Sequence, residues 1–210
     1  MNPHSLLTTH HSPFIIMLPE IILASQSPRR KQLLEWAEVS FEIIVRHSEE
    51  NFPPDIPVEQ VPIFIARNKA LTVKEYLLLN DIMIRPVLAA DTIVVLGEQI
   101  IGKPKDRQDA INILLSLSGK MHRVITGVVI ENEAEEIAFA DITEVVFNEL
   151  TEEQVIFYVD KYKPYDKAGA YAIQEWIGVV GIQSIKGDFY NVMGLPVSRV
   201  VKELTKLTTD

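Results

Sequence analysis

The stretch Ile21-Ile-Leu-Ala-Ser-Gln-Ser-Pro-Arg-Arg30 predicts a short buried strand that passes through a polar hinge into a helix. Its first four residues are apolar, as a buried strand requires. Ser27 has the chemistry of a helix N-cap, and Pro28 suits the first helical position. The residues that follow predict an apolar face on this helix, formed by Leu33, Leu34 and Trp36.

Three cations, Arg29, Arg30 and Lys31, crowd the first turn of this helix, where the macrodipole favours negative side chains. A bound anion would offset that repulsion, because free backbone N–H groups and two guanidinium groups converge at the helix N-terminus. The pattern therefore predicts a phosphate site. A solvated basic helix face is the alternative that these residues alone leave open.

Strand and helix patterns alternate along the rest of the chain. The apolar periodicity predicts strands over 41–45, 87–96, 99–101, 122–131, 136–149 and 179–185, and helices over 58–79, 106–117, 151–162 and 196–207. This order predicts an α/β fold with a mixed, twisted sheet flanked by helices. We expect one domain over residues 17–210, preceded by a disordered extension over residues 1–16, and Met17 is a candidate start of the chain.

The composition narrows the classes of function. The chain of 210 residues has a net charge of −9 and no cysteine. The absence of cysteine excludes disulfides and cysteine nucleophiles and fits a reducing cytosol. An acidic chain is a poor binder of nucleic-acid polymers, although cations gathered in one cleft can still bind a small polyanion. No apolar run is long enough to span a bilayer, so we expect no membrane partner.

Asp91 interrupts the apolar stretch Ala89-Ala-Asp-Thr-Ile-Val-Val95. Burying an unpaired carboxylate costs several kcal/mol or shifts its pKa, so Asp91 must meet a cation, a metal or a hydrogen-bond network. One interpretation is a buried salt bridge. The other is a general base or metal ligand at a strand end, where α/β proteins place their sites.

Three other charged residues, Lys69, Lys103 and Glu50, are candidate partners of Asp91 in a site. A hairpin over residues 91–103 would return Lys103 to the neighbourhood of that carboxylate. Lys69 lies on the long predicted helix, where surface cations are ordinary. Glu50 follows the second strand and belongs either to a polar loop or to the ligands of a hard cation such as Mg²⁺.

The segment Asp166-Lys-Ala-Gly-Ala-Tyr-Ala-Ile-Gln-Glu175 combines small residues with an amide. Small side chains allow a ligand to approach the backbone closely. The amide of Gln174 could read the edge of a nucleobase, because it offers both a donor and an acceptor. A tight packing turn is the alternative.

Together these segments resemble one family over residues 21 to about 205. The matching motifs, in order, are Ser25-Gln-Ser-Pro-Arg-Arg30, Ala90-Asp-Thr92, Gly102-Lys-Pro104, Asp166-Lys-Ala-Gly-Ala-Tyr171 with Ile173-Gln174, and Gly194-Leu-Pro196. They resemble those of the Maf family of nucleoside triphosphate pyrophosphatases. The resemblance implies a cytoplasmic enzyme that uses a divalent cation, Mg²⁺ or Mn²⁺, to release a nucleoside monophosphate and pyrophosphate. It also implies a fold shared with the inosine triphosphate pyrophosphatases, often as a homodimer.

The resemblance assigns roles residue by residue. Asp91 matches the proton acceptor, and Arg29, Thr92 and Gln174 match the positions that mark the dTTP/UTP branch. A sister branch that acts on 7-methyl-guanosine triphosphate has tryptophan in place of Arg29. The remaining matches form the family's polar cleft, with Glu50 as the metal ligand: Ser25, Arg30, Glu50, Lys69 and Lys103. The chain departs from the family pattern at Asn68, Ala172 and Glu175, and Ala172 could alter the approach of the backbone beside Gln174.

Two other functions stay open from the sequence. A nucleotidyltransferase also begins with a strand and an anion-binding loop, but those loops are usually rich in glycine and residues 25–28 contain none. A non-catalytic regulator fits the family's link to arrest of septum formation. Such a binding module would not need Asp91 within an apolar strand.

Overall fold

The structure is a computed structural model that describes residues 18–207. The predicted extension over residues 1–16 and the candidate start at Met17 lie outside the described residues. No helix within residues 18–207 is both long and apolar enough to cross a membrane.

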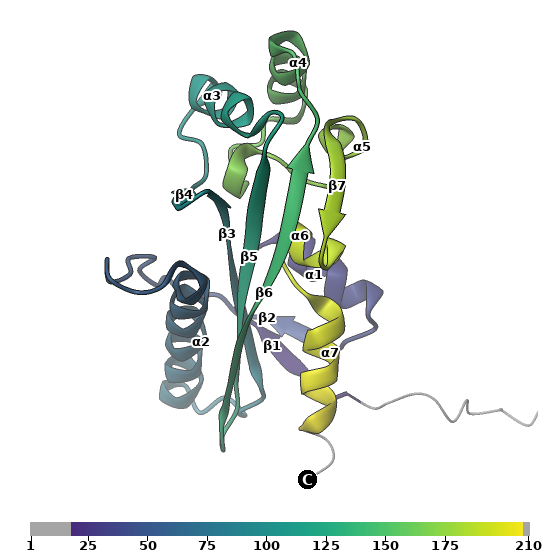
Figure 1. Cartoon of the computed structure of the whole chain (residues 1–210). Helices are drawn as coiled ribbons and strands as arrows, with labels where there is room; N and C mark the ends of the chain where they lie inside the picture. The colour runs from purple at the N-terminus through teal and green to yellow at the C-terminus, as the bar shows by residue number, and fades with distance from the viewer. Residues whose placement is uncertain (1–17, 208–210) are drawn as a thin grey trace, which may run out of the picture.

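A seven-stranded mixed sheet runs through the molecule in the order β2-β1-β3-β5-β6-β7, and β4 pairs with β3 beside this path (Figure 1). Strand β1 is parallel to β2 and β3, and the other pairs are antiparallel. The strands are β1 (Ile21–Leu23), β2 (Phe41–Ile43), β3 (Val87–Leu96), β4 (Gln99–Ile101), β5 (Met121–Glu131), β6 (Glu136–Phe147) and β7 (Ile182–Lys186). The predicted mixed sheet is confirmed.

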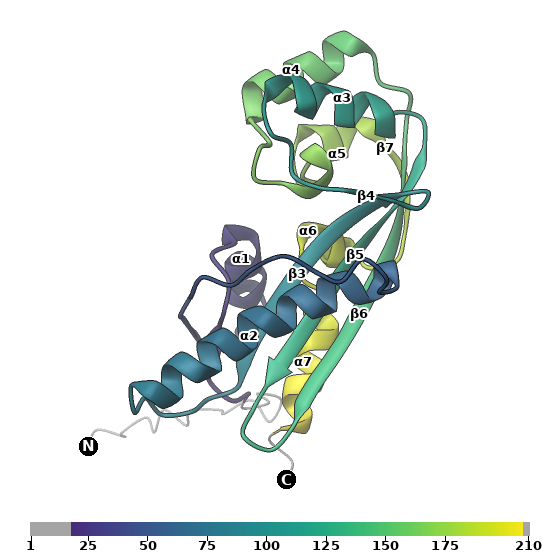
Figure 2. The ribbon, with the colours of Figure 1, turned by 90° about the vertical axis from the view of Figure 1, so that its left-hand side faces the viewer.

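Helices cover both faces of the sheet. Helix α2 lies along one face, and α1, α6 and α7 lie on the other (Figures 1 and 2). Helices α3, α4 and α5 gather with β7 in a lobe at one end. The helices are α1 (Pro28–Trp36), α2 (Val61–Leu79), α3 (Arg107–Leu117), α4 (Glu152–Tyr162), α5 (Trp176–Gly181), α6 (Phe189–Met193) and α7 (Val197–Lys206), with 3₁₀ turns η1 (Val58–Gln60) and η2 (Ala168–Ala170).

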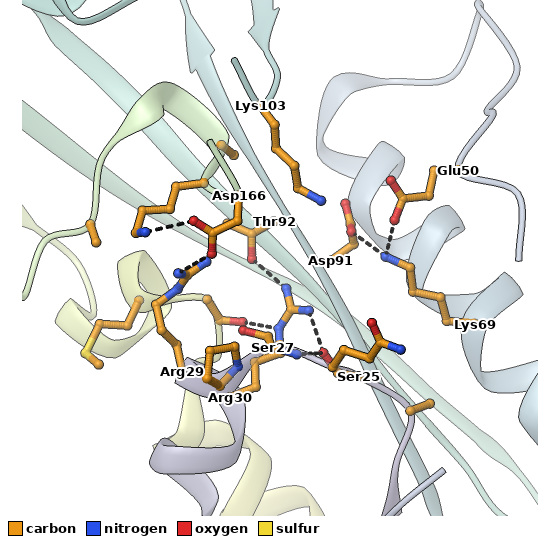
Figure 3. Close-up of a pocket in the computed structure, with 18 of the residues that line it drawn as sticks. Ser25, Ser27, Arg29, Arg30, Glu50, Lys69, Asp91, Thr92, Lys103 and Asp166 are labelled. Atoms are coloured by element: carbon orange, nitrogen blue, oxygen red, sulfur yellow. Dashed lines mark hydrogen bonds and ion pairs between the residues drawn. The ribbon is translucent and has the colours of Figure 1, made fainter. Parts of the chain in front are cut away.

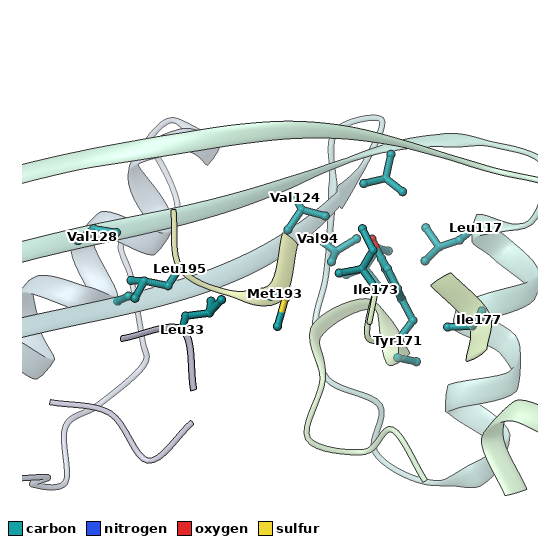
Figure 4. Packing of buried hydrophobic residues seen from close by; sticks show 14 of the residues in the cluster. Leu33, Val94, Leu117, Val124, Val128, Tyr171, Ile173, Ile177, Met193 and Leu195 are labelled. Atoms are coloured by element: carbon teal, nitrogen blue, oxygen red, sulfur yellow. The ribbon is translucent and has the colours of Figure 1, made fainter. Parts of the chain in front are cut away.

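Strand β3 is buried on both faces, and its side chains alternate between two hydrophobic clusters. Ala89 packs with the buried side of α2, whereas Leu88 and Ala90 pack with residues of α1 and α7. Figure 4 shows the second cluster, in which Leu33 of α1 lies near Leu195. Because side chains alternate along a strand, the next two residues of β3, Asp91 and Thr92, face opposite sides of the sheet.

The end lobe has an aromatic centre. The rings of His122, Phe147 and Tyr171 meet edge to face, with centroids 5.0–5.5 Å apart. Burial lowers the pKa of His122 to about 4, so its imidazole is neutral at pH 7. Its Nε2 lies 2.8 Å from the Tyr171 hydroxyl. Tyr171 thereby ties the 166–175 segment to the core of the lobe.

Three local predictions are wrong. The strand predicted over 179–185 begins only at Ile182, because the preceding β-branched residues form the short helix α5, where Val179 is 81% exposed. The Ser27 side chain makes no cap bond, and its backbone N–H donates to Ser25 Oγ instead. Trp36 is 60% exposed rather than on the buried face of α1.

Candidate active site

A cleft of about 610 Å³ lies beside the polar hinge, where β1 ends and leaves the edge of β3 uncovered. Its walls come from the hinge, α2, β3, the 166–174 segment and the 192–194 segment. Six Lys and Arg side chains line it against three carboxylates: Arg29, Arg30, Arg46, Lys69, Lys103 and Lys167 against Glu50, Asp91 and Asp166. The cleft is therefore cationic in a chain whose net charge is −9, which suits a small polyanion.

Asp91 meets its cation on the α2 side of the sheet. Its Oδ1 lies 2.7 Å from Lys69 Nζ, and the same ammonium lies 2.8 Å from Glu50 Oε1 (Figure 3). The hydrogen bond from Lys69 lowers the pKa of Glu50, and the nearby charges of Lys103 and Arg30 act in the same direction. Lys69 thus holds two carboxylates close together, and both line the cleft.

Asp91 does not lie at a strand end as predicted. It stands in the middle of β3, opposite Gly127 of β5. The site is open there because the parallel neighbour β1 pairs with β3 only as far as Leu88. Asp91 is therefore exposed because the neighbouring strand β1 ends, and not because β3 ends.

Arg30 occupies the other side of the sheet, close to Thr92. Only 9% of the residue is exposed. Its guanidinium donates to the Gly194 carbonyl at 2.8 Å, to Ser25 Oγ at 3.1 Å and to Thr92 Oγ1 at 3.1 Å. Burial lowers the pKa of Arg30, and Asp91 opposes that shift, but an arginine guanidinium keeps its proton in proteins.

Arg29 points toward the end lobe instead of joining Arg30. Its Nη1 lies 3.3 Å from Asp166 Oδ2, and Lys167 Nζ lies 2.8 Å from the other oxygen of that carboxylate (Figure 3). The sequence predicted that both guanidinium groups converge on one anion at the helix N-terminus. The two side chains in fact serve different walls of the cleft, because successive helical residues diverge by about 100°.

Lys103 returns beside Asp91 through the predicted hairpin. Strands β3 and β4 pair Val94 with Ile101, two residues before Lys103. Figure 3 shows the Lys103 side chain reaching toward the Asp91 carboxylate. Within residues 18–207 the Lys103 ammonium forms no ion pair, so its charge is available to a ligand.

Gln174 lines the cleft from a loop that Tyr158 holds in place. The buried Tyr158 hydroxyl accepts a hydrogen bond from the Ala172 backbone N–H at 3.1 Å and donates one to the Glu175 carboxylate. These two bonds flank Gln174 on either side. The small residues before it pack tightly, since a Cβ on Gly169 would lie 2.9 Å from Val94 Cγ2. The packing-turn interpretation therefore holds for this part of the segment.

Comparison with known proteins places the chain in a family. The family model described as "Maf-like protein" matches residues 20–207. The chain belongs to this family. Its relatives include proteins named dTTP/UTP pyrophosphatase from Cytophaga hutchinsonii (48% identity, covering 90% of this chain and 84% of the relative), Parabacteroides distasonis (43%, 88% and 94%) and Phocaeicola vulgatus (44%, 90% and 96%).

All the site residues predicted for this Maf-like protein line the one cleft. They are Ser25, Arg29, Arg30, Glu50, Lys69, Asp91, Thr92, Lys103 and Gln174. The two interpretations of Asp91 are compatible, because its salt bridge lies within the cleft. The individual roles of these residues stay predictions.

Sequence reasoning missed several residues of this Maf-like site. Lys167 lines the cleft and lies 3.7 Å from Glu175, and its place beside Asp166 in the quoted motif was the available signal. Tyr158 had no such signal, because it lies on α4, far from the hinge in sequence. Glu175 pairs with Tyr158 and Lys167. Asn68 does not line the cleft but lines an adjoining hollow, which shares His47 and Ser48 with it.

Proposed function

We propose that this Maf-like protein hydrolyses dTTP and UTP to the nucleoside monophosphate and pyrophosphate, as a cleaner of the nucleotide pool. The observation that carries the proposal is the Asp91 carboxylate, held 2.7 Å from Lys69 at the floor of a cleft lined by six cations. The names of the relatives support the choice of substrate.

The cations of the cleft suit a triphosphate. A nucleoside triphosphate carries about four negative charges, and its cleavage depends on positioning and charge neutralisation more than on covalent chemistry. Lys69 and Lys103 lie beside Asp91, and Arg30 lines the same cleft from the other side of the sheet. All three bind the phosphates in this proposal. Ser25 holds Arg30 in place.

Asp91 acts as the general base. Its Oδ1 is engaged by Lys69, whereas Oδ2 accepts no hydrogen bond from the described residues. That oxygen takes a proton from the water that attacks the α-phosphorus, and pyrophosphate leaves. A serine nucleophile is less suited, because the Ser25 hydroxyl is engaged by Arg30 and by the Ser27 backbone N–H and bonds no histidine among the described residues.

The site also suits a divalent cation carried by the substrate. No cluster of three or more His, Asp or Glu side chains within residues 18–207 could hold a metal by itself. Mg²⁺ usually takes only one or two carboxylates and completes its shell with water and phosphate oxygens. Glu50 supplies one such carboxylate, and bound Mg²⁺ or Mn²⁺ would neutralise phosphate charge.

Arg29 and Gln174 lie on the wall of the cleft that recognises the base. The bond to Asp166 turns Arg29 away from the cations around Asp91 and toward the segment that carries Gln174. The Gln174 amide offers a donor and an acceptor, which match the edge of uracil or thymine. We also infer a cytoplasmic location, where nucleotide pools are found, and the homodimer stays a prediction.

The test of the proposed reaction is a panel of nucleoside triphosphates with product analysis. We expect dTTP and UTP to yield dTMP or UMP plus pyrophosphate, and we expect a chelator to stop the reaction. Release of orthophosphate and a nucleoside diphosphate would contradict the proposal. Binding of nucleotides without turnover would favour a non-catalytic regulator instead.

The base-recognition wall gives a prediction on specificity. Arg29→Trp and Gln174→Ala should lower kcat/KM for dTTP and UTP by about ten- to a hundred-fold, the effect of one lost polar contact. Turnover of 7-methyl-guanosine triphosphate should fall much less. Steady-state kinetics with dTTP, UTP, CTP, GTP and the methylated purine measure the ratios.

Lys31→Trp is the matched control for the specificity prediction. Lys31 is the next residue of α1, is exposed and pairs only with Glu35 at 3.6 Å among the described residues. The same bulky substitution there should leave all the ratios unchanged. An equal loss for every nucleotide in the Arg29 and Gln174 variants would assign these residues to the phosphates or the fold.

A further inference from the structure

A buried chain of hydrogen bonds leads from Arg30 into the core of the sheet. Arg30 Nη2 lies 3.1 Å from Thr92 Oγ1, which lies 2.9 Å from Thr126 Oγ1 of β5. Thr126 Oγ1 in turn lies 3.1 Å from the backbone carbonyl oxygen of Asn191 in α6. Thr92 and Thr126 are direct cross-strand partners, so strand pairing itself brings their hydroxyl groups together.

The two ends of this hydrogen-bond chain determine which group donates and which accepts in each bond. A carbonyl oxygen can only accept, so Thr126 gives its single hydroxyl hydrogen to Asn191. Thr126 must then accept a hydrogen bond from Thr92. The Thr92 hydroxyl donates its only hydrogen in that bond. A guanidinium can only donate, so Thr92 accepts from Arg30. Thr92 therefore has no hydrogen left to donate to a substrate.

The far end of the chain is rigidly held. Asn191 is fully buried, and its Nδ2 donates to the Val124 carbonyl at 3.1 Å and to Thr143 Oγ1 at 3.0 Å. Thr143 gives its own hydrogen to the Asp188 carbonyl at 2.9 Å. Both contacts of Nδ2 thus require a donor, which fixes the orientation of the amide.

The effect of the chain falls on the guanidinium of Arg30. Ser25, Gly194 and Thr92 accept from three of its N–H groups. A guanidinium has five N–H groups, so two remain for a ligand. Because the three acceptors hold the plane of the guanidinium, these two groups have a defined direction, and Arg30 lines the cleft.

We propose that Thr126 is a positioning residue of the phosphate-binding site, which acts through Thr92 to hold Arg30 in its binding orientation. The inference rests on the proposed function, in which Arg30 binds phosphate. Thr126 is fully buried and lies between apolar residues of β5, where valine would fill the same volume. The hydroxyl group, rather than the shape of the side chain, is therefore the feature to be tested.

The experiment compares Thr126→Val with Thr126→Ser. Valine keeps the volume and removes the hydroxyl, whereas serine keeps the hydroxyl and removes a methyl group. We expect Thr126→Val to raise the Kd for pyrophosphate, measured by calorimetry, and the KM for dTTP and UTP alike by roughly ten-fold. The kcat should change much less, and Thr126→Ser should stay near the wild type. If Thr126→Val does not fold, Thr126→Ala removes the hydroxyl without placing a methyl group against the Asn191 carbonyl oxygen.

Three results would overturn the inference. Wild-type values in Thr126→Val would mean that the residue only fills space. Equal losses in the valine and serine variants would point to the methyl group, and a changed ratio between nucleotides would assign Thr92 to the base. Failure of the proposed function looks different, because the wild type itself would then release no pyrophosphate, while pyrophosphate binding would still report on Arg30.

Discussion

We expect Asp91→Asn to lower the kcat for dTTP by roughly 100-fold or more, the scale of a lost general base. Asparagine keeps the shape of the side chain and can accept a hydrogen bond from Lys69, but it cannot take a proton from water. Removing a negative charge leaves the cleft more cationic. The KM for the triphosphate should therefore not rise, and the loss should fall on kcat. Steady-state kinetics with circular dichroism of the purified variant measure both quantities.

Glu131→Gln is the matched control for Asp91→Asn. Glu131 also pairs with an α2 lysine, Lys74, but it is the last residue of β5 and does not line the cleft. Its substitution should leave kcat near the wild-type value. Normal turnover by a well-folded Asp91→Asn variant would return Asp91 to a structural role and remove the central support of the proposed reaction.

A large loss of stability is expected for Gly127→Ala. Gly127 lies opposite Asp91 in the sheet, and a Cβ there would lie 2.2 Å from the backbone nitrogen of Ile63 in α2. A backbone atom cannot move aside as a flexible side chain can, so helix α2 itself must shift. Overpacking of this kind costs about 3 kcal/mol or more. For a chain of this size that lowers Tm by about 10 °C in thermal unfolding.

Gly102→Ala is the control that tests whether the loss of Tm in Gly127→Ala comes from the contact with Ile63. A Cβ on Gly102 meets nothing within 4 Å, so its Tm should stay close to that of the wild type. The folded fraction of Gly127→Ala should also lose activity, because α2 carries the Lys69 that contacts Asp91. Equal Tm values for the two variants would show that α2 approaches the sheet less closely than described.

Much of the architecture follows from local patterns of sequence. The ten-residue run of β3 and the hairpin to β4 were predicted with their observed bounds. Helix α4 was predicted from its acidic first turn, and Thr151 forms the capping box that begins it. Such elements are predictable because strand alternation, helical periodicity and capping depend on residues close together in the chain.

Local patterns failed where short elements gain their stability from distant contacts. Helix α6 is only five residues long, and its Asn191 is held by bonds to β5 and β6. The β-branched residues of α5 favour a strand by propensity, yet a Cβ on its Gly178 would lie 1.7 Å from the Ile173 carbonyl oxygen. Position 178 therefore requires glycine because of a contact with residue 173, which lies outside the helix.

The sequence by itself determined the α/β class, the carboxylate of Asp91 within an apolar strand and the set of cations that a phosphate site needs. Only the tertiary structure decided which partner each of these side chains contacts. Alternation along β3 sends Asp91 toward Lys69 and Thr92 toward Arg30 on the opposite face. Helical divergence sends Arg29 to Asp166. The sequence determines the chemical type of each side chain, but the packing of segments far apart in the chain determines which partner it contacts.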